Sequence, residues 1–426
     1  MLWKLRSQWR GPSPTVLFAI SNVTVSACAL AGALVCAKLL APQEMGAFQT
    51  AMLLVTYLGF LPFGVVNGFN RQYPFLLGKG DEASADLFAR NGYSVSRVMG
   101  VVAAAVATGQ AIWFKQTTSD TVLFVAALSV IPVAALSQVG AIQNAIVTGR
   151  HLFLLAAKAQ FSLAIVTLGL LSLVWQFGAS GQAVRLVVLA AVPWIIYSSA
   201  TRSARTWHWD WRILFDLIKR GFPILAIGYA YQVFSVADRT LVAKVLGLEA
   251  VGHYALAGIA IVAIQSVYTP LAVATYSKAN HAFGKSPQWS VLVAPAKRLV
   301  VLVTVTVLPL ATTIYFALPS LVSWLLPDYS DGIRAGQIAC VASVAFCYCG
   351  TSFVFNVTGH NWVYGSLVSG ALVVFFAVGF MIPKSDLSLE LVATIRTIVT
   401  IILCVLTNAY VLFYLMRGIK QERGMR

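Results

Sequence analysis

The chain has 426 residues, of which 59% are hydrophobic and only 10% are charged. Soluble domains are about 45–50% apolar and about 25% charged, so this composition and the mean hydropathy of +0.81 exclude a soluble protein and indicate an integral membrane protein. The net charge of +16 does not indicate a nucleic-acid partner, because the basic residues flank apolar runs. In that position they are typical of topology signals that face anionic lipid.

The apolar runs are long and lack the two-residue alternation of membrane strands, which predicts an all-α fold with about 12 transmembrane helices. The segments of spanning length are 15–40, 46–68, 93–114, 121–148, 152–177, 183–200, 221–246, 251–275, 293–318, 334–357, 362–382 and 391–416.

Charge predicts the orientation of these segments. With a cytoplasmic N-terminus, 20 of the 30 basic residues fall in inner segments. The outer ends hold seven: Lys38, Lys115, Arg185, Lys244, Arg334, Lys384 and Arg396. The positive-inside rule then places both termini in the cytoplasm, and we expect residues 1–14 to be an uncleaved cytoplasmic start in which Trp3 and Trp9 anchor the chain at the interface.

A repeated stretch divides the chain. Ala37–Phe48 returns 206 positions later as Ala243–Tyr254, and Val147–Gly149 returns 210 positions later as Val357–Gly359. The matches are short, so chance similarity is the alternative. A true repeat predicts a six-helix lobe over 1–200, a cytoplasmic interfacial linker helix over 201–220 and a second six-helix lobe over 221–426. Six spans per repeat make the two lobes parallel.

The linker is expected to be amphipathic, because its large apolar residues share one helical face. These residues are Trp207, Trp211, Leu214, Phe215 and Ile218. A surface anchor and a lipid-headgroup sensor are the two interpretations.

Polar side chains recur at helical spacing in predicted spans 1, 2, 7 and 8, where burial in hydrocarbon is costly unless the side chains line water or substrate. In span 2 the spacing of Thr56, Asn67 and Arg71 predicts one continuous polar face. We therefore predict a substrate cavity; the alternative is hydrogen bonding between helices without a transport role. The candidate residues are Asn22, Ser26, Asn67, Asn70, Arg71, Gln232, Ser235, Asp238, Arg239, Gln265 and Thr269.

Asp238 and Arg239 form the one adjacent pair of opposite charges inside a predicted span. Neighbours on a helix point about 100° apart, so each is expected to find another partner. Arg239 would offer a positive charge to an anionic substrate, with Asp238 orienting it or binding a coupling ion. A structural clamp between helices explains Asp238 equally well.

Enzyme signatures are missing from the sequence. There is no phosphate-binding loop, no metal-ligand spacing and no nucleophile grouping in a polar context. The six cysteines all lie in apolar runs, where they are expected to pack as small hydrophobic residues. We therefore expect no catalytic residues, no metal and no cofactor.

Two groups of residues resemble a known family. Leu40-Ala41-Pro42, Gly46 and Phe48, followed by Gly64, Asn67 and Arg71, resemble the first half of bacterial polysaccharide-repeat-unit flippases. Asp238-Arg239 and Leu241, followed by Val251-Gly252, Tyr254 and Ala257, resemble their seventh and eighth spans. These O-antigen and capsule flippases belong to the multidrug/oligosaccharidyl-lipid/polysaccharide exporter superfamily and have a MATE-like fold.

The resemblance implies an alternating-access transporter of the bacterial inner membrane that takes part in the biosynthesis of surface polysaccharide. Its partners would be a polyprenyl-pyrophosphate-linked oligosaccharide, membrane lipids and other polysaccharide assembly proteins. Arg71 and Arg239 match positions where the family places basic residues. A MATE-like exporter of drugs or cations, and a membrane glycan polymerase or ligase, are the alternatives. The first would use an unpaired carboxylate in the membrane, and the second a large outer loop.

Overall fold

The computed structural model describes residues 13–424, and within that range every regular element is a helix or a helical turn. This is the expected outcome for a chain in hydrocarbon, where each backbone N–H and C=O must be paired inside its own segment. The prediction of an all-α membrane fold is confirmed. The predicted cytoplasmic start with Trp3 and Trp9 lies outside the described residues.

The chain forms two compact units. The first unit comprises Met1–Gly32, Leu61–Gly109 and Ile131–Phe222, and the second comprises Ala33–Phe60, Gln110–Val130 and Pro223–Arg426. The boundaries of the units cut several helices. The division into lobes at 1–200 and 221–426 stays a prediction.

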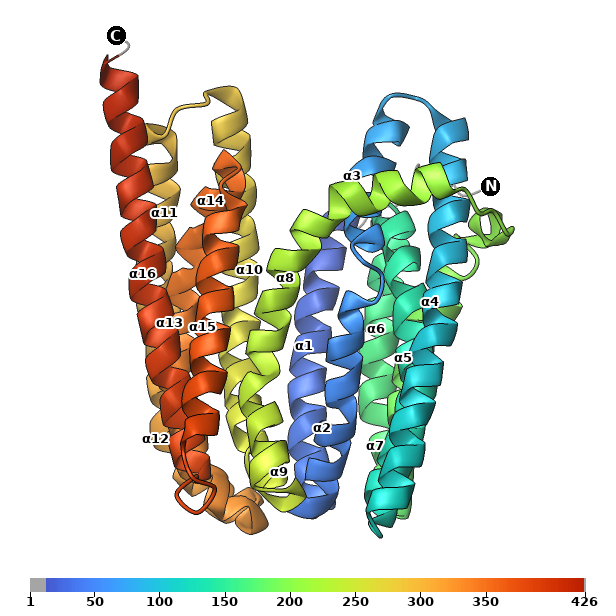
Figure 1. Ribbon diagram of the computed structural model, residues 1–426, viewed down its shortest axis with the longest axis vertical. Coiled ribbons are helices and arrows are strands. Elements are labelled where there is room, and N and C mark those ends of the chain that lie inside the picture. The colour runs from blue at the N-terminus through green and yellow to red at the C-terminus, as the bar shows by residue number, and fades with distance from the viewer. Residues whose placement is uncertain (1–12, 425–426) are drawn as a thin grey trace. The chain divides into compact units, whose positions relative to one another are not determined.

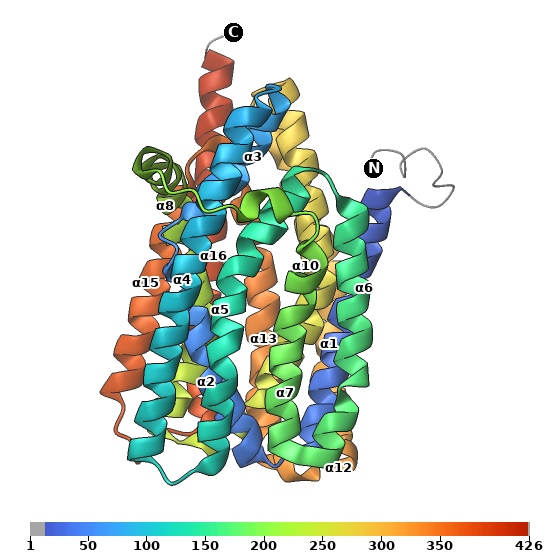
Figure 2. The same ribbon diagram turned by 90° about the vertical axis from the view of Figure 1, so that its right-hand side faces the viewer.

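The first unit is a bundle whose core is formed by Phe69, Tyr73, Ile142 and Leu217 among others. In Figure 2 the neighbouring helices α6 and α7 run side by side. Gly178 breaks the helical conformation of α7 with a φ of 53°, which is accessible to glycine at little cost. Its elements are α1 (Pro14–Leu39), α3 (Val65–Gly78), α4 (Glu82–Thr117), α5 (Thr121–Gly149), α6 (Phe153–Gly169), α7 (Leu171–Tyr197) and the turn η3 (Arg202–Arg205).

The second unit has two adjoining cores, one around Phe234, Leu241 and Phe375 and the other around Ile264 and Phe355. Figure 1 shows α16 lying beside α13 and α15. Its elements are α2 (Pro42–Tyr57), η2 (Leu58–Phe60), α8 (Trp211–Val245), α9 (Leu248–His253), α10 (Ala255–Lys285), α11 (Ser290–Leu302), η4 (Val303–Val307), α12 (Leu308–Leu325), η5 (Pro327–Gly332), α13 (Ile333–Tyr348), η6 (Cys349–Ser352), α14 (Phe353–Thr358), α15 (Asn361–Met381) and α16 (Leu389–Gly424).

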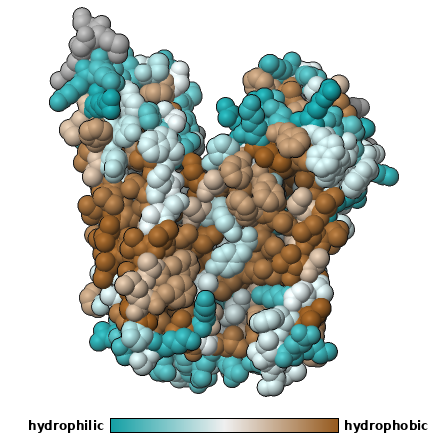
Figure 3. Space-filling model, in the orientation of Figure 1, coloured by the Kyte–Doolittle hydropathy of each residue, from teal (hydrophilic) through white to brown (hydrophobic). Residues whose placement is uncertain are grey.

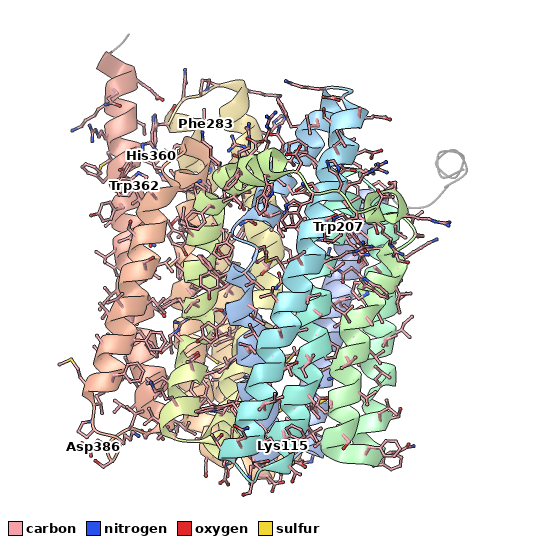
Figure 4. All side chains as sticks on the ribbon, turned by 45° about the vertical axis from the view of Figure 1, so that its right-hand side comes forward. Lys115, Trp207, Phe283, His360, Trp362 and Asp386 are labelled. Atoms are coloured by element: carbon pink, nitrogen blue, oxygen red, sulfur yellow. The ribbon has the colours of Figure 1, made fainter. Side chains whose placement is uncertain are left out.

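The surfaces of the helices fit a lipid environment. Large apolar side chains such as Ile165, Val373 and Val405 are exposed along them. In Figure 3 hydrophobic residues cover the middle of the helices and hydrophilic residues gather toward the ends. Within the second unit, Lys115 and Asp386 lie at one end of the helices, and Phe283, His360 and Trp362 lie at the other (Figure 4). The chain is therefore an integral, multi-pass membrane protein.

All twelve predicted segments are covered by helix, but they are not equally apolar. Among the described residues, nine helices are long and apolar enough to span a bilayer, and the bent pair of α2 and α3 makes ten. Of the remaining two segments, α6 is short and α8 carries the polar residues Gln232, Ser235, Asp238 and Arg239. The sequence thus marked both segments correctly as helical, although their composition alone is weaker evidence for a span.

Predicted span 2 is not one continuous helix, which corrects the sequence-based expectation. The helical segment ends at Phe60 and resumes at Val65, Gly64 adopts a φ of 88°, and the bend between α2 and α3 is 54°. Thr56 therefore does not share one helical face with Asn67 and Arg71, because the spacing rule holds only along an unbroken helix. The break follows from Pro62 and Gly64, because proline and glycine interrupt helices.

The predicted linker helix over 201–220 is also corrected. Apart from the short turn η3, only residues 211–220 are helical, and they are the first part of α8. Trp207 lies before that helix, and the expected apolar face is split. Leu214 is buried, whereas Trp211 and Phe215 are exposed. Instead, the ring of Trp209 contacts the rings of both Trp207 and Trp211.

The repeated stretch forms two short helix starts that pack against each other inside the second unit. Helix α2 begins at Pro42 and α9 at Leu248, which are equivalent positions of the repeat. A Cβ atom on Gly46 would lie 1.8 Å from the carbonyl O of Leu248, and one on Gly252 would lie 1.8 Å from the carbonyl O of Pro42. The contact is reciprocal, and only glycine permits it.

Candidate functional site

A cavity in the second unit gathers polar side chains from four helices. It is lined by α8, α10, α13 and α16, together with the residue that joins α9 to α10. Its lining residues are Tyr231, Ser235, Asp238, Tyr254, Ile261, Gln265, Ala339, Ala342, Ser343, Phe346, Ala393, Arg396 and Thr400.

Helical spacing explains the contribution of α8. Tyr231, Ser235 and Asp238 stand at i, i+4 and i+7, so they share one face of the helix. Gln265 on α10 reaches the same space. The alanines of α13 and α16 leave room for these longer side chains, since small residues allow helices to approach closely.

Asp238 is held by neutral donors. It is only 2% exposed, and its Oδ2 accepts a hydrogen bond of 3.0 Å from the hydroxyl of Tyr254. Its Oδ1 accepts a 2.9 Å bond from the backbone N–H of Arg239. The partner of the carboxylate is therefore Tyr254, and the side chain of Arg239 makes no salt bridge with it. Two donors fix this carboxylate in place.

Arg396 is the cation of the cavity. Its guanidinium carbon lies 3.5 Å from the centroid of the Phe234 ring, in cation–π geometry. Its Nη1 is buried and has no hydrogen-bond partner among the described residues. No described carboxylate lies within 4.0 Å of its guanidinium, although Asp238 lines the same cavity. A buried donor without an acceptor is costly, so this atom is suited to bind a ligand oxygen.

Three predicted site residues of the second unit meet in the cavity, namely Ser235, Asp238 and Gln265. The other three do not line it. Gln232 and Thr269 are exposed, and Arg239 is half-buried with its guanidinium against Gly258.

The predicted residues of the first unit lie on α1 and α3. Asn22 and Ser26 donate hydrogen bonds to the carbonyls of Phe18 and Asn22 in their own helix. Asn67 is half-buried, whereas Asn70 and Arg71 are exposed. A role for these five residues in binding stays a prediction.

The sequence-based reasoning missed the contribution of α13 and α16, including Ser343, Arg396 and Thr400. It assigned Arg396 and Arg185 to outer ends, but both arginines lie within helices, and Arg185 is only 6% exposed. A charged residue several positions inside an apolar run was the available signal, because such residues are expensive in a membrane and mark functional sites.

The groups that line this cavity could hold a polar ligand. A guanidinium, an amide, several hydroxyls and aromatic faces can hold a polar ligand by hydrogen bonds and stacking. The described residues contain no group of three or more His, Cys, Asp or Glu side chains that could hold a metal ion.

No family model matches this sequence, and no curated protein matches it. Solved structures do. The chain superposes on an inward-facing multidrug resistance MATE family transporter of the MOP superfamily with a TM-score of 0.71 and 15% identity, covering 95% of this chain and 99% of that one. An outward-facing structure of a multidrug resistance MATE family transporter gives a TM-score of 0.65 at 16% identity, over 96% and 98% of the two chains.

A MOP superfamily transporter from Pyrococcus furiosus, described as having a binding pocket of reverse polarity, gives a TM-score of 0.64 at 16% identity over 95% of both chains. Identities this low establish a shared fold and leave the substrate open. The chain therefore has the fold of MATE transporters over nearly its whole length.

Proposed function

We propose that this protein is a transporter that moves a lipid-linked oligosaccharide across the bacterial inner membrane by alternating access, for the synthesis of surface polysaccharide. The MATE-like fold supports a transporter, since solved proteins of this fold are described in both inward-facing and outward-facing conformations. The charge inside the spans supports an anionic cargo.

The observation that supports an anionic cargo is the balance of charge within the membrane. Of the 14 acidic residues, Asp238 alone lies inside a predicted span, and its carboxylate already accepts two hydrogen bonds. Arg185, Arg239 and Arg396 lie inside helices of the spans. Three arginines against one carboxylate give these membrane-spanning helices an excess of positive charge, which in a low dielectric favours a pyrophosphate group over a cationic drug.

Deleting the gene in its bacterial host tests the cargo. The flippase predicts the loss of surface polysaccharide, with completed repeat units retained on their lipid carrier in extracted membranes. An exporter of drugs predicts normal polysaccharide together with increased sensitivity to cationic drugs. That second result would refute the proposal in favour of the MATE-like alternative.

Single substitutions test the contribution of the cationic side chains. Arg239→Ala and Arg71→Ala are each expected to abolish complementation of the deletion without lowering the amount of protein in the membrane. Lys420→Ala, an exposed residue near the end of α16, is the matched control and should complement fully. Full complementation by both arginine variants would contradict the argument from charge.

A further inference from the structure

The cavity of the second unit holds a hydrogen-bond donor without an acceptor, beside acceptors that keep free lone pairs. The donor is Nη1 of Arg396, which is buried and has no partner among the described residues. Ser235, Ser343 and Thr400 each donate their hydroxyl hydrogen to a carbonyl of their own helix. A hydroxyl oxygen keeps lone pairs after it has donated, so in this structure these three side chains present acceptors to the cavity.

Asp238 and Gln265 add to the same inventory. Each carboxylate oxygen of Asp238 accepts one hydrogen bond and has a lone pair left. The Gln265 amide makes no hydrogen bond with another described residue. A matching ligand therefore offers one strong acceptor to Arg396 and several donors to the other groups. A halide has no donor to offer, whereas a polyhydroxylated molecule has many.

The charge of the cavity limits the charge of its ligand. Among the described residues that line it, Arg396 and Asp238 carry the only charges, so the lining is neutral overall. Arg185 and Arg239 do not line it. A single carboxylate can pair with Arg396 against one repulsive partner, whereas pyrophosphate would bring more negative charge toward Asp238 in a low dielectric. The cavity therefore favours a ligand with one negative charge.

The length and the walls of the cavity suit a single ring. Its lining extends from Tyr231 to Asp238 on α8 and from Ala393 to Thr400 on α16, which is about 10 Å along each helix at roughly 1.5 Å per residue. The rings of Tyr231 and Phe346, whose centroids are 5.3 Å apart, contribute aromatic area to the wall. The apolar face of a sugar ring can pack against such a wall.

We propose that this cavity binds an acidic sugar, meaning a sugar ring that carries one carboxylate. The carboxylate accepts a charge-assisted hydrogen bond from Nη1 of Arg396, and the ring hydroxyls donate to Asp238 and to the neighbouring hydroxyl oxygens. As a statement about the cargo, the inference rests on the function proposed above, and it adds that the oligosaccharide contains an acidic sugar. The pyrophosphate of that cargo then binds outside this cavity.

Thermal unfolding of the purified full-length protein in neutral detergent tests the binding, with tryptophan fluorescence as the signal. Sodium glucuronate and sodium galacturonate are titrated at constant ionic strength against glucose, galactose and sodium acetate. A ligand that binds the native state raises the midpoint, so we expect a saturable rise of about 2 °C or more for at least one acidic sugar. Neutral sugars and acetate each lack part of the contacts and should bind at least about tenfold more weakly. Acidic sugars that protect no better than their neutral counterparts would overturn the proposal.

Substitutions in the cavity separate the charge from the fold. Arg396→Gln removes the cation and should abolish the preference for the acidic over the neutral sugar. Gln265→Met keeps both charges and the length of the side chain, and should weaken binding of the acidic sugar about three- to tenfold even if Arg396→Gln does not fold. Arg334→Gln, at an exposed position of α13, is the matched control and should leave the affinity unchanged. A preference that persists in Arg396→Gln, or an unchanged affinity in Gln265→Met, contradicts the assignment.

The composition of the polysaccharide that the deletion strain loses tests the statement about the cargo. We expect an acidic sugar in its repeat unit, and a lost polysaccharide without one would refute this statement. Loss of polysaccharide, without binding of acidic sugars to the purified protein, overturns the acidic-sugar site alone. Binding together with normal polysaccharide in the deletion strain overturns the proposed function instead, so the two failures are distinct.

Discussion

The two copies of the predicted repeat agree in one region and differ in another. At the repeated turns, Gly46 and Gly252 make the same close approach to the backbone of the other turn, at the same distance. Inside the helices, Gly32 and Asp238 are 206 positions apart, but Gly32 packs against the guanidinium of Arg185, whereas Asp238 is a carboxylate in the cavity of Arg396.

This difference separates what a duplicated fold preserves from what it leaves free. Backbone contacts at the turns tolerate no side chain, so glycine is required on both sides. The helix interior tolerates a change of charge wherever another group, or a bound ligand, balances it. We therefore expect substitutions to have similar effects at the two turns and different effects at the two arginines.

The largest effect is expected for Asp238→Ala, which would make the second unit resemble the first. The change leaves Arg396 without a carboxylate in its cavity and Tyr254 without an acceptor. Each buried group left unsatisfied costs about 1–3 kcal/mol, and a charged group costs more. The free energy of unfolding in detergent measures this loss. Ser235→Ala is the control, because the Ser235 hydroxyl donates only to the carbonyl of Gln232 in its own helix; equal effects of the two variants would contradict the prediction.

Tyr254→Phe should have a smaller effect, because it removes the hydroxyl that donates to Asp238 and keeps the ring. A hydrogen bond to a charged group contributes about 1.5–3 kcal/mol. Unfolding by denaturant measures the change, with Tyr410→Phe as a matched control, since Tyr410 is 43% exposed. A loss no greater than that of the control would show that the carboxylate is held by other groups.

Gly46→Ala and Gly252→Ala test the similarity of the turns. Each added Cβ would meet a backbone carbonyl oxygen at 1.8 Å, which cannot rotate away, and overpacking of this kind costs about 1–3 kcal/mol. Gly140→Ala is the control, because nothing lies within 4 Å of its added Cβ and alanine stabilises a helix by about 0.5–1 kcal/mol relative to glycine. Melting temperatures of the three variants compare them directly. Unequal losses at Gly46 and Gly252 would argue against a reciprocal contact.

The smallest effect is expected for Asp86→Asn, which breaks an ion pair at the surface of the first unit. The amide of asparagine lacks the negative charge that the Asp86 carboxylate places 2.9 Å from Nη2 of Arg150. The Asp86 side chain is 41% exposed and the Arg150 side chain is 34% exposed. Exposed pairs contribute about 0–1 kcal/mol, and salt reduces that further. Unfolding at low and high salt checks this. A loss close to that of Asp238→Ala would mean that burial is not what makes the interior charges different.

Helical spacing in the sequence predicted only part of the lining of the cavity. The spacing of Ser235 and Asp238 on one helix was readable from the sequence, and both residues line the cavity together with Gln265. Thr269 was placed on the same stripe as Gln265 by spacing, but it does not line the cavity. Helical spacing identifies a face of a helix, whereas the packing of other helices decides which part of that face is enclosed.

The sequence by itself determined the membrane class and the helical segments, because hydrophobic length and residue spacing are properties of neighbouring residues. It also identified Asp238 as the acidic residue within a span. Only the tertiary structure decided the bend at Gly64, the reciprocal contact of Gly46 and Gly252, the burial of Arg185 and the place of Arg396 in the cavity. These features depend on groups far apart in the chain, whose contacts are determined by the packing of whole helices.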